Sequence, residues 1–361
     1  MLYLILISFL LVFILMVYYL IRQVNKSYLI NKINNKKIKY SINSIILVII
    51  VIFLFFNMTN TMIIIIHLFV ILLLFNFIFY IIEKIFNKKI KYNISLIISI
   101  LLTTIYMIYG YYLANNIVQT NYTLFTDKIS SDFRIIQISD THIGTTINGN
   151  EFKNYITKFN DLNPDIVVIT GDFIDDSTSY DDMVKSVESL NLLNTKYGVY
   201  FVYGNHDKGY FNNRRYTKED FKNLLIKNNV KVLEDDIVNI NEEILLIGRQ
   251  DHQVSNRSSM EELTKNIDKN KYIITLDHQP RDFENQSKSN VDLVLSGHTH
   301  GGQFIPIGPI SVLLNINDGY YGLSKINNTN FIISSGMSNW AFKFKTGCIS
   351  EYVVIDIKNM L

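Results

Sequence analysis

Apolar residues follow two different patterns along the 361-residue chain. In the first third they form long, nearly uncharged runs, whereas from Phe133 onward they form short β-branched runs separated by polar segments. An uncharged run of roughly 20 residues is long enough to cross a bilayer as a helix. Short runs bounded by Gly, Asp and Asn predict buried strands. The pattern therefore predicts an apolar helical region followed by an α/β domain.

The apolar region, residues 1–114, is expected to hold about four transmembrane helices. Its apolar stretches are Leu2 to Ile21, Ile42 to Phe56, Met62 to Ile82 and Ile94 to Leu113. The second stretch is short, so whether it spans is left open. A signal peptide is the alternative for the first stretch. That stretch lacks a basic start and an Ala-x-Ala-like exit, which favours a retained helix.

Basic residues in the short loops predict the orientation of these helices. The loop Asn57 to Thr61 is uncharged, whereas the loops after the first and third stretches are basic. The loop after the first stretch carries Arg22, Lys26, Lys32, Lys36, Lys37 and Lys39, and the loop after the third carries Lys84, Lys88, Lys89 and Lys91. Both basic loops should be cytoplasmic, which places the amino terminus outside. We therefore expect a multi-pass protein of the cell membrane with an extracytoplasmic downstream domain. The parity reverses if the second stretch does not span.

The charge of the chain divides at the same place. Residues 1–114 carry a net charge of +9 and the remainder −7, which together give the overall +2. An acidic downstream domain lacks the basic surface that nucleic-acid binding requires, so we expect no nucleic-acid partner. The single cysteine, Cys348, excludes an intrachain disulfide.

Polar blocks follow the predicted strands of the downstream domain. The strands are Phe133 to Ser139, Ile166 to Thr170, Val199 to Tyr203, Tyr272 to Leu276 and Val291 to Leu295. The blocks are Asp140-Thr141-His142, Gly171-Asp172 with Asp175, Gly204-Asn205-His206-Asp207, Asp277-His278, and Gly297-His298-Thr299-His300. In α/β sheets, side chains at the carboxyl ends of strands converge. Distant segments can therefore build one site.

The residue types of these blocks favour one dinuclear metal site. Asp, Asn and His without a thiolate suit Mn, Fe, Zn, Co or Mg. Asp-x-His and His-x-His place both side chains on one side of an extended segment. A lone His or Asp at a strand end is more often a turn former. Here, however, the blocks contain five of the chain's seven histidines.

These blocks, in this order, resemble the signature of the calcineurin-like metallophosphoesterase superfamily over about residues 133 to 357. The extension Gly301-Gly302-Gln303, followed by Pro306, resembles its bacterial membrane-attached or exported branch. The resemblance implies a four-layer sandwich, two β-sheets flanked by helices, over residues 132–361. The Asn-, Thr- and Ser-rich residues 115–131 are expected to be a linker.

The resemblance also implies a role for each matching residue. One metal would be held by Asp140, His142 and His300. The other would be held by Asn205, His278 and His298, and the carboxylate of Asp172 would bridge the two. His206 would be the catalytic acid, oriented by Asp175, and Asp207 would hold the loop. The implied enzyme is a metal-dependent phosphoric ester hydrolase that cleaves a phosphomonoester or phosphodiester through a metal-bridging hydroxide.

Membrane attachment suggests the kind of substrate, and the full set of signature residues weighs against the non-enzymatic alternatives. Attachment to the lipid bilayer favours a lipid-linked or cell-envelope phosphate ester. The alternative is a catalytically silent membrane scaffold, whose mark would be loss of His206 or of several ligands, and none is lost. A transporter or sensor is disfavoured because the spans hold one histidine, His67, and no acid.

Two weaker features complete the prediction. Arg214 and Arg215 could clamp a substrate phosphate, although a solvated surface pair is favoured. Trp340, Phe342 and Phe344 could contact lipid or an apolar substrate, and an edge strand explains them equally well.

Overall fold

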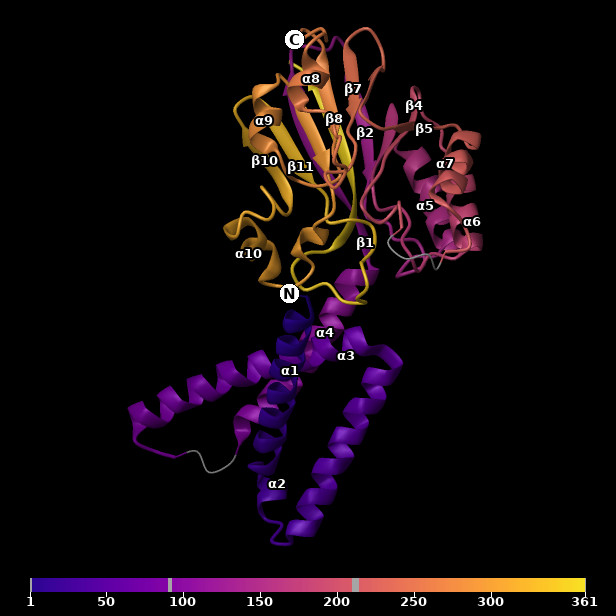
Figure 1. Cartoon of the computed structure of the whole chain (residues 1–361). Helices are drawn as coiled ribbons and strands as arrows, with labels where there is room; N and C mark the ends of the chain where they lie inside the picture. The colour runs from indigo at the N-terminus through magenta and orange to yellow at the C-terminus, as the bar shows by residue number, and fades with distance from the viewer. Residues whose placement is uncertain (1, 90–92, 210–213, 361) are drawn as a thin grey trace. The chain divides into compact units, whose positions relative to one another are not determined.

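The computed structural model describes residues 2–89, 93–209 and 214–360 (Figure 1). Contacts divide the chain into two compact units, Met1–Tyr109 and Gly110–Leu361. The helix α4 (Ile94–Asn115) begins in the first unit and ends in the second. Its last turn therefore belongs to the second unit.

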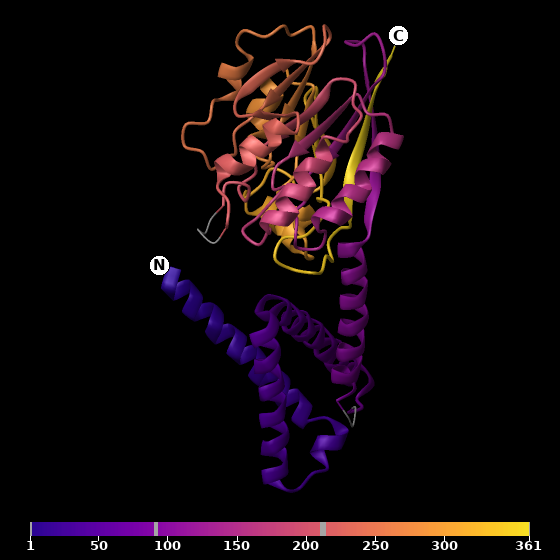
Figure 2. The same ribbon diagram turned by 90° about the vertical axis from the view of Figure 1, so that its right-hand side faces the viewer.

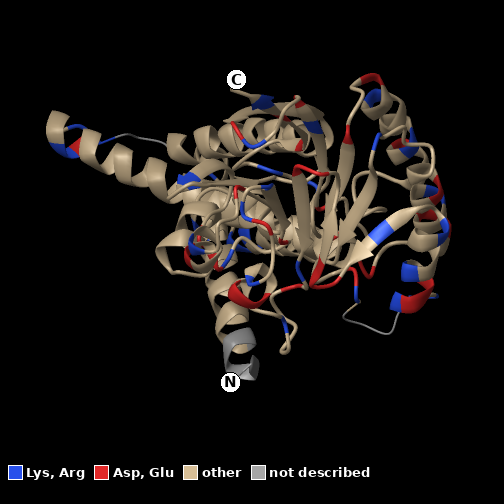
Figure 3. Ribbon diagram, turned by 90° about the horizontal axis from the view of Figure 1, so that it is seen from above, with Lys and Arg blue, Asp and Glu red and all other residues tan. Residues whose placement is uncertain are grey.

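The first unit is helical. It contains α1 (Leu2–Asn25), the short α2 (Tyr28–Asn31), α3 (Lys36–Phe86) and most of α4. Within the described residues, α1, α3 and α4 are long and apolar enough to cross a membrane. Large apolar side chains are exposed along all three helices, and charged residues are sparse on them (Figure 3). Exposed apolar surface of this extent is typical of a membrane-associated region.

The helix α3 differs from the sequence-based prediction. The second and third apolar stretches lie in two helices that meet at a kink within α3, at Asn57, whose backbone angles are non-helical. The loop expected from Asn57 to Thr61 is thus reduced to a kink, and both helices together count 51 residues. A straight helix of that length would measure roughly 75 Å, against a hydrocarbon layer of about 30 Å. The Asn57 side chain accepts the backbone N–H of Asn60 at 3.1 Å, as an N-cap would. The four predicted stretches thus occur as α1, the two arms of α3, and α4.

The second unit contains two six-stranded sheets. The first has the order β1 (Ile117–Thr126), β12 (Ser350–Asn359), β2 (Phe133–Ile138), β3 (Ile166–Thr170), β4 (Gly198–Val202), β5 (Val230–Leu233). The second has the order β10 (Gly322–Ile326), β11 (Thr329–Ile333), β9 (Leu293–Ser296), β8 (Tyr272–Leu276), β7 (Ile244–Gly248), β6 (Asp236–Asn239). Strands β2 to β5 are parallel, and so are β7 to β9. Their carboxyl ends therefore lie at one edge of each sheet.

Helices cover the outer face of each sheet. The first sheet packs against α5 (Gly149–Asp161), α6 (Tyr180–Leu190) and α7 (Lys218–Lys227), and the second against α8 (Met260–Thr264) and α9 (Phe283–Lys288) (Figure 1). The inner faces share a core that includes Ile135, Val168, Leu246 and Ile274. The outer helices α5 to α7 carry charges of both signs (Figure 3). The predicted four-layer sandwich is confirmed.

The expected linker, residues 115–131, is wrong over most of its length. Residues Ile117 to Thr126 form the edge strand β1, which pairs in parallel with β12 over its whole length (Figure 2). Thr and Tyr favour strands, and the backbone hydrogen bonds to β12 do not depend on side-chain polarity. The polar composition of this segment reflects its exposed edge position.

Candidate metal centre

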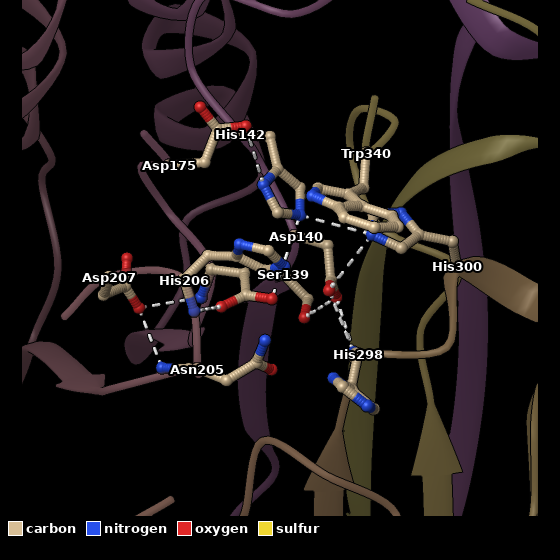
Figure 4. Close-up of polar contacts among 12 residues, drawn as sticks. Ser139, Asp140, His142, Asp175, Asn205, His206, Asp207, His298, His300 and Trp340 are labelled. Atoms are coloured by element: carbon tan, nitrogen blue, oxygen red, sulfur yellow. Dashed lines mark hydrogen bonds and ion pairs between the residues drawn. The ribbon is translucent and has the colours of Figure 1, made fainter. Parts of the chain in front are cut away.

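The predicted ligands all follow strands, and they come from both sheets. In the first sheet, β2 is followed by Asp140 and His142, β3 by Asp172, and β4 by Asn205. Strands β8 and β9 of the second sheet lead into His278, and into His298 and His300. The backbone N–H of His298 donates to both carboxylate oxygens of Asp140 at 2.9 Å, which ties the two sheets together (Figure 4). The candidate centre thus lies at the seam between the sheets.

The ligand side chains form two groups that could each hold a metal ion. One group is Asp140, His142 and His300, and the other is Asp172, His278 and His298. In the first, the Nε2 atoms of His142 and His300 are 3.2 Å apart. In the second, His278 Nε2 lies 3.1 Å from Asp172 Oδ2. The structure brings together every residue that the sequence suggested as a ligand.

Asp172 and Asn205 complete this arrangement. Asp172 Oδ2 is also 3.8 Å from His142 Nε2, so this carboxylate lies between the two groups. The Oδ1 atom of Asn205 lies 3.1 Å from His278 Nε2. These positions are compatible with a bridging Asp172 and an Asn205 ligand.

The backbone at the candidate ligands is strained. Asp140, His142, Asp172, His298 and His300 have positive φ angles between 38° and 71°. Such conformations cost of order 1 kcal/mol or more each for residues other than glycine, and they cluster at functional sites. The chain turns sharply after β2, β3 and β9, and the side chains that follow these strands lie at the seam.

Close packing explains the glycines of the signature blocks. A Cβ atom on Gly297 would lie 1.8 Å from Ser139 Oγ and 2.2 Å from Asp140 Oδ2. A Cβ atom on Gly204 would lie 2.2 Å from Asp172 Oδ1. Any larger residue at either position would displace a candidate ligand.

Burial and neighbouring charges together shift the pKa values of the candidate ligands. It lowers the pKa of His298 to about 3 and the pKa of His300 well below its usual range. Burial acts to raise the pKa of Asp172, but the neighbouring His278 holds it well below its usual range. Burial also raises the pKa of Asp140. Burial acts to lower the pKa of His142 and His278, but neighbouring carboxylates raise both. The pKa shifts therefore differ among the ligands, and it is the residue types of the donor set, Asp, Asn and His, that fit divalent metal ions.

Asp175 does not lie where the sequence placed it. Its Oδ2 atom lies 3.2 Å from Nδ1 of His142, a candidate metal ligand, whereas the expectation was that it orients His206 (Figure 4). The other carboxylate oxygen accepts the backbone N–H and the hydroxyl of Ser177 at 2.7 and 2.6 Å. A carboxylate behind a metal-binding imidazole fixes its tautomer and orientation. The geometry fits that role toward His142.

The loop that carries His206 is held from two sides. Both carboxylate oxygens of Asp207 accept backbone N–H groups, at 2.8 to 3.1 Å, from Asp172, Phe173, Ile174 and Gly204. This confirms the loop-holding role expected of Asp207. Arg214 donates to the backbone carbonyls of Asp207 and His206 and pairs with Asp176. Arg214 is therefore a buried structural residue and not a solvated surface cation.

The sequence did not identify what lies against His206. The rings of His206 and Trp340 are 5.4 Å apart, and the rings of His206 and His142 are 5.2 Å apart. Trp340 lies in an irregular segment between β11 and β12, so the edge-strand interpretation of residues 340–344 is wrong. No spacing signal connects Trp340 with His206, because they are 134 positions apart in the chain.

Comparison with known proteins identifies the class. Residues 133–302 match the family model described as calcineurin-like phosphoesterase. A metallophosphoesterase of Campylobacter jejuni is 29% identical over 287 residues, which cover 76% of this chain and 72% of the relative. A bovine transmembrane protein with a metallophosphoesterase domain is 28% identical over 242 residues, which cover 61% of this chain and 52% of that protein. The match thus spans about half the length of the bovine relative.

Among solved structures, a dimetal phosphatase from Danio rerio aligns with a TM-score of 0.37 at 12% identity, covering 56% of this chain and 87% of that one. Residues 133–302 of the present chain thus carry a calcineurin-like phosphoesterase domain. It is a metal-dependent phosphoesterase.

Proposed function

We propose that this protein is a membrane-anchored phosphoesterase whose site holds two divalent metal ions and hydrolyses a phosphomonoester or phosphodiester. The observation that carries the proposal is the pair of buried donor groups with Asp172 between them. Two ions bound there would neutralise phosphate oxygens and activate water for in-line attack. Asp140, His142 and His300 would hold one ion, and Asn205, His278 and His298 the other, with Asp172 shared.

In this proposal His206 donates the proton that the leaving oxygen needs. Its backbone N–H is bonded to Asp172 Oδ1 at 2.7 Å, so the residue is fixed beside the shared carboxylate. Burial lowers the pKa of His206, and Asp172 acts in the opposite direction. A phosphate ester entering the site adds negative charge, which favours the protonated imidazole. The ring can then serve as a general acid near neutral pH.

The remaining polar residues position these groups. Asp175 would hold the Nδ1 proton of His142 so that Nε2 faces the first metal. Asp277 directly precedes His278 in the chain, and its buried carboxylate contacts Arg249, Arg257 and Gln286. Its charge is therefore compensated away from the metals, and it is not proposed as a ligand.

The membrane anchor is the second part of the proposal. Residues 1–114 would form the anchor with about four crossings, and the basic loops around residues 22–39 and 84–91 would be cytoplasmic. The catalytic domain, residues 132–361 together with β1, would then be extracytoplasmic. Anchoring favours phosphate esters confined to the membrane or cell envelope, including lipid-linked ones.

The test is hydrolysis by the full chain in detergent. The protein would be stripped of metal, titrated with Mn, Zn, Fe, Co and Mg, and offered a chromogenic phosphomonoester and phosphodiester. We expect metal-dependent turnover that His206→Ala abolishes and Asp161→Asn, at an exposed position, leaves intact. A folded chain that binds metal ions and turns over neither ester would refute the proposed activity.

A further inference from the structure

An exposed apolar segment follows the last candidate ligand. After His300 the chain passes through η1 (His300–Gly302) into α10 (Ile307–Leu313). The large apolar side chains around α10 are between 43% and 79% exposed; they are Ile305, Ile307, Ile310, Leu313, Leu314 and Ile316. The helix contains no charged residue. A contiguous apolar patch of this kind marks an interaction site.

This segment is fixed to the loop that carries Trp340. The backbone N–H of Thr346 donates to Gln303 at 2.7 Å, and the N–H of Ile305 donates to the Thr346 hydroxyl at 3.2 Å. The rings of Phe304 and Phe342 pack edge to face with centroids 5.1 Å apart. Figures 1 and 2 both place α10 and this loop at the same end of the catalytic unit. We call residues 305–316 together with Trp340 the docking surface.

The same loop is fixed to the end of a candidate membrane span. The backbone N–H of Lys345 donates to Gly110 at 3.0 Å, and the Asn339 side chain donates to the carbonyl of Ala114 at 3.1 Å. The rings of Tyr111 and Phe344 lie 6.3 Å apart. A Cβ atom on Gly110 would lie 3.1 Å from the Lys345 carbonyl, so this approach is close. These contacts all lie within the second unit.

The last turns of α4 indicate the level of the membrane surface. They carry Tyr109, Tyr111 and Tyr112, and tyrosine and tryptophan concentrate at the boundary between hydrocarbon and water. The loop bonded to this turn therefore lies at that boundary. Lys343, exposed in the same loop, adds a cation suited to anionic headgroups. Apolar side chains beside an interfacial tyrosine belt fit a lipid leaflet.

We propose that the docking surface rests on the lipid leaflet from which α4 emerges and presents the metal centre to phosphate esters at the membrane surface. Trp340 links the two functions, because its ring contacts the catalytic candidate His206 at 5.4 Å and is 45% exposed. The substrate class that follows is a phosphate ester in the headgroup region of a lipid. This inference rests on the proposed phosphoesterase activity for its substrate class, but not for the docking itself.

The chain offers a direct test because Trp340 is its only tryptophan. The full chain is reconstituted into phosphatidylcholine–phosphatidylglycerol vesicles with or without lipids brominated near the headgroup, and Trp340 emission is recorded. Docking predicts strong quenching by the brominated lipids and weak quenching by aqueous iodide. Strong iodide quenching without lipid quenching would overturn the proposal.

A pair of double variants identifies the docking element. Leu313→Glu with Leu314→Glu removes the two most exposed leucines of the surface, and Leu192→Glu with Ile226→Glu changes two side chains of 54% exposure on the outer helical layer. Burying one leucine shifts an equilibrium by roughly tenfold or more. We therefore expect the first pair to abolish most lipid quenching and the second to leave it unchanged. Equal quenching in both pairs would overturn the role of α10.

A parallel assay separates docking from catalysis. Hydrolysis of a water-soluble chromogenic ester should be the same in both double variants, whereas hydrolysis of phosphatidate in the vesicles should fall about tenfold or more only in the first. Lipid quenching without any turnover would refute the proposed activity and leave docking standing. Protection of Leu313→Cys by a second copy of the chain, with no lipid quenching, would overturn docking in favour of self-association.

Discussion

Replacing Asp175 by Asn tests which histidine this carboxylate positions. In the structure it lies 3.2 Å from His142 Nδ1, whereas the sequence led us to expect that it orients His206. The asparagine keeps the side-chain shape and removes the charge that favours the Nδ1 proton of His142. We therefore expect weaker metal binding rather than loss of the acid.

The magnitude follows from comparable sites. Removing an outer carboxylate behind a metal-binding histidine weakens metal affinity by roughly 10- to 100-fold, or about 1.4 to 2.7 kcal/mol. Asp175 is buried and also holds Ser177, so a value toward the upper end is expected. Activity of Asp175→Asn should return close to the wild-type kcat once metal is saturating.

The assay is a metal titration of activity and of binding, run beside His206→Ala and the exposed control Asp181→Asn. His206→Ala should bind metal normally and lose kcat at every metal concentration. The reasoning would be refuted if Asp175→Asn bound metal as tightly as the wild type and lost kcat as His206→Ala does. That result would restore the sequence-based assignment.

Three further predictions concern stability and packing. Asp207→Ala leaves four buried N–H donors without their acceptor, so the free energy of unfolding should fall by at least about 3 kcal/mol in urea titrations; an effect below about 1 kcal/mol would contradict the loop role. Gly297→Ala would force Asp140 aside and should abolish metal-dependent activity in a chain that still folds; normal activity would show that the seam has room. Burial acts to raise the pKa of Glu234, but Lys222 and Lys218 hold it below its usual value. Its stabilising effect is therefore full above the unfolded pKa and is lost as pH falls through the folded value. Lys222→Met should accordingly show a smaller loss of stability between about pH 5 and pH 3 than the wild type, and an equal loss would contradict the ion pair.

The parts of the fold that could be predicted from the sequence are those set by local patterns. Runs such as Ile166 to Thr170 are buried on both faces, and their composition identifies them as parallel strands. The candidate ligands follow such strands directly. Because the carboxyl ends of parallel strands converge, this position was enough to predict that the ligands lie in one site.

The errors occur where distant contacts decide the structure. Strand β1 is polar because it lies at a sheet edge, and its partner β12 is more than 220 positions away in the chain. Asp175 faces His142 because of how two strand-end turns approach one another, which no sequence spacing encodes. Trp340 reaches His206 for the same reason.

The short second apolar stretch shows a third kind of limit. Hydropathy predicted a loop from Asn57 to Thr61, whereas in the structure the break between the two helices is a kink at Asn57. The side chain of Asn57 caps the helix that follows, so the second helix begins directly after this residue.

The central claim is a shared two-metal site, and the most direct measurement is the number of ions bound per chain. The purified full chain, stripped and reloaded, would be analysed by elemental mass spectrometry beside Asp172→Asn and the exposed control Asp161→Asn. We predict two divalent ions per chain in the wild type and in the control, and at most one in Asp172→Asn, with activity lost. A wild type that binds a single ion, or an Asp172→Asn chain that binds two and hydrolyses its ester normally, would contradict the account.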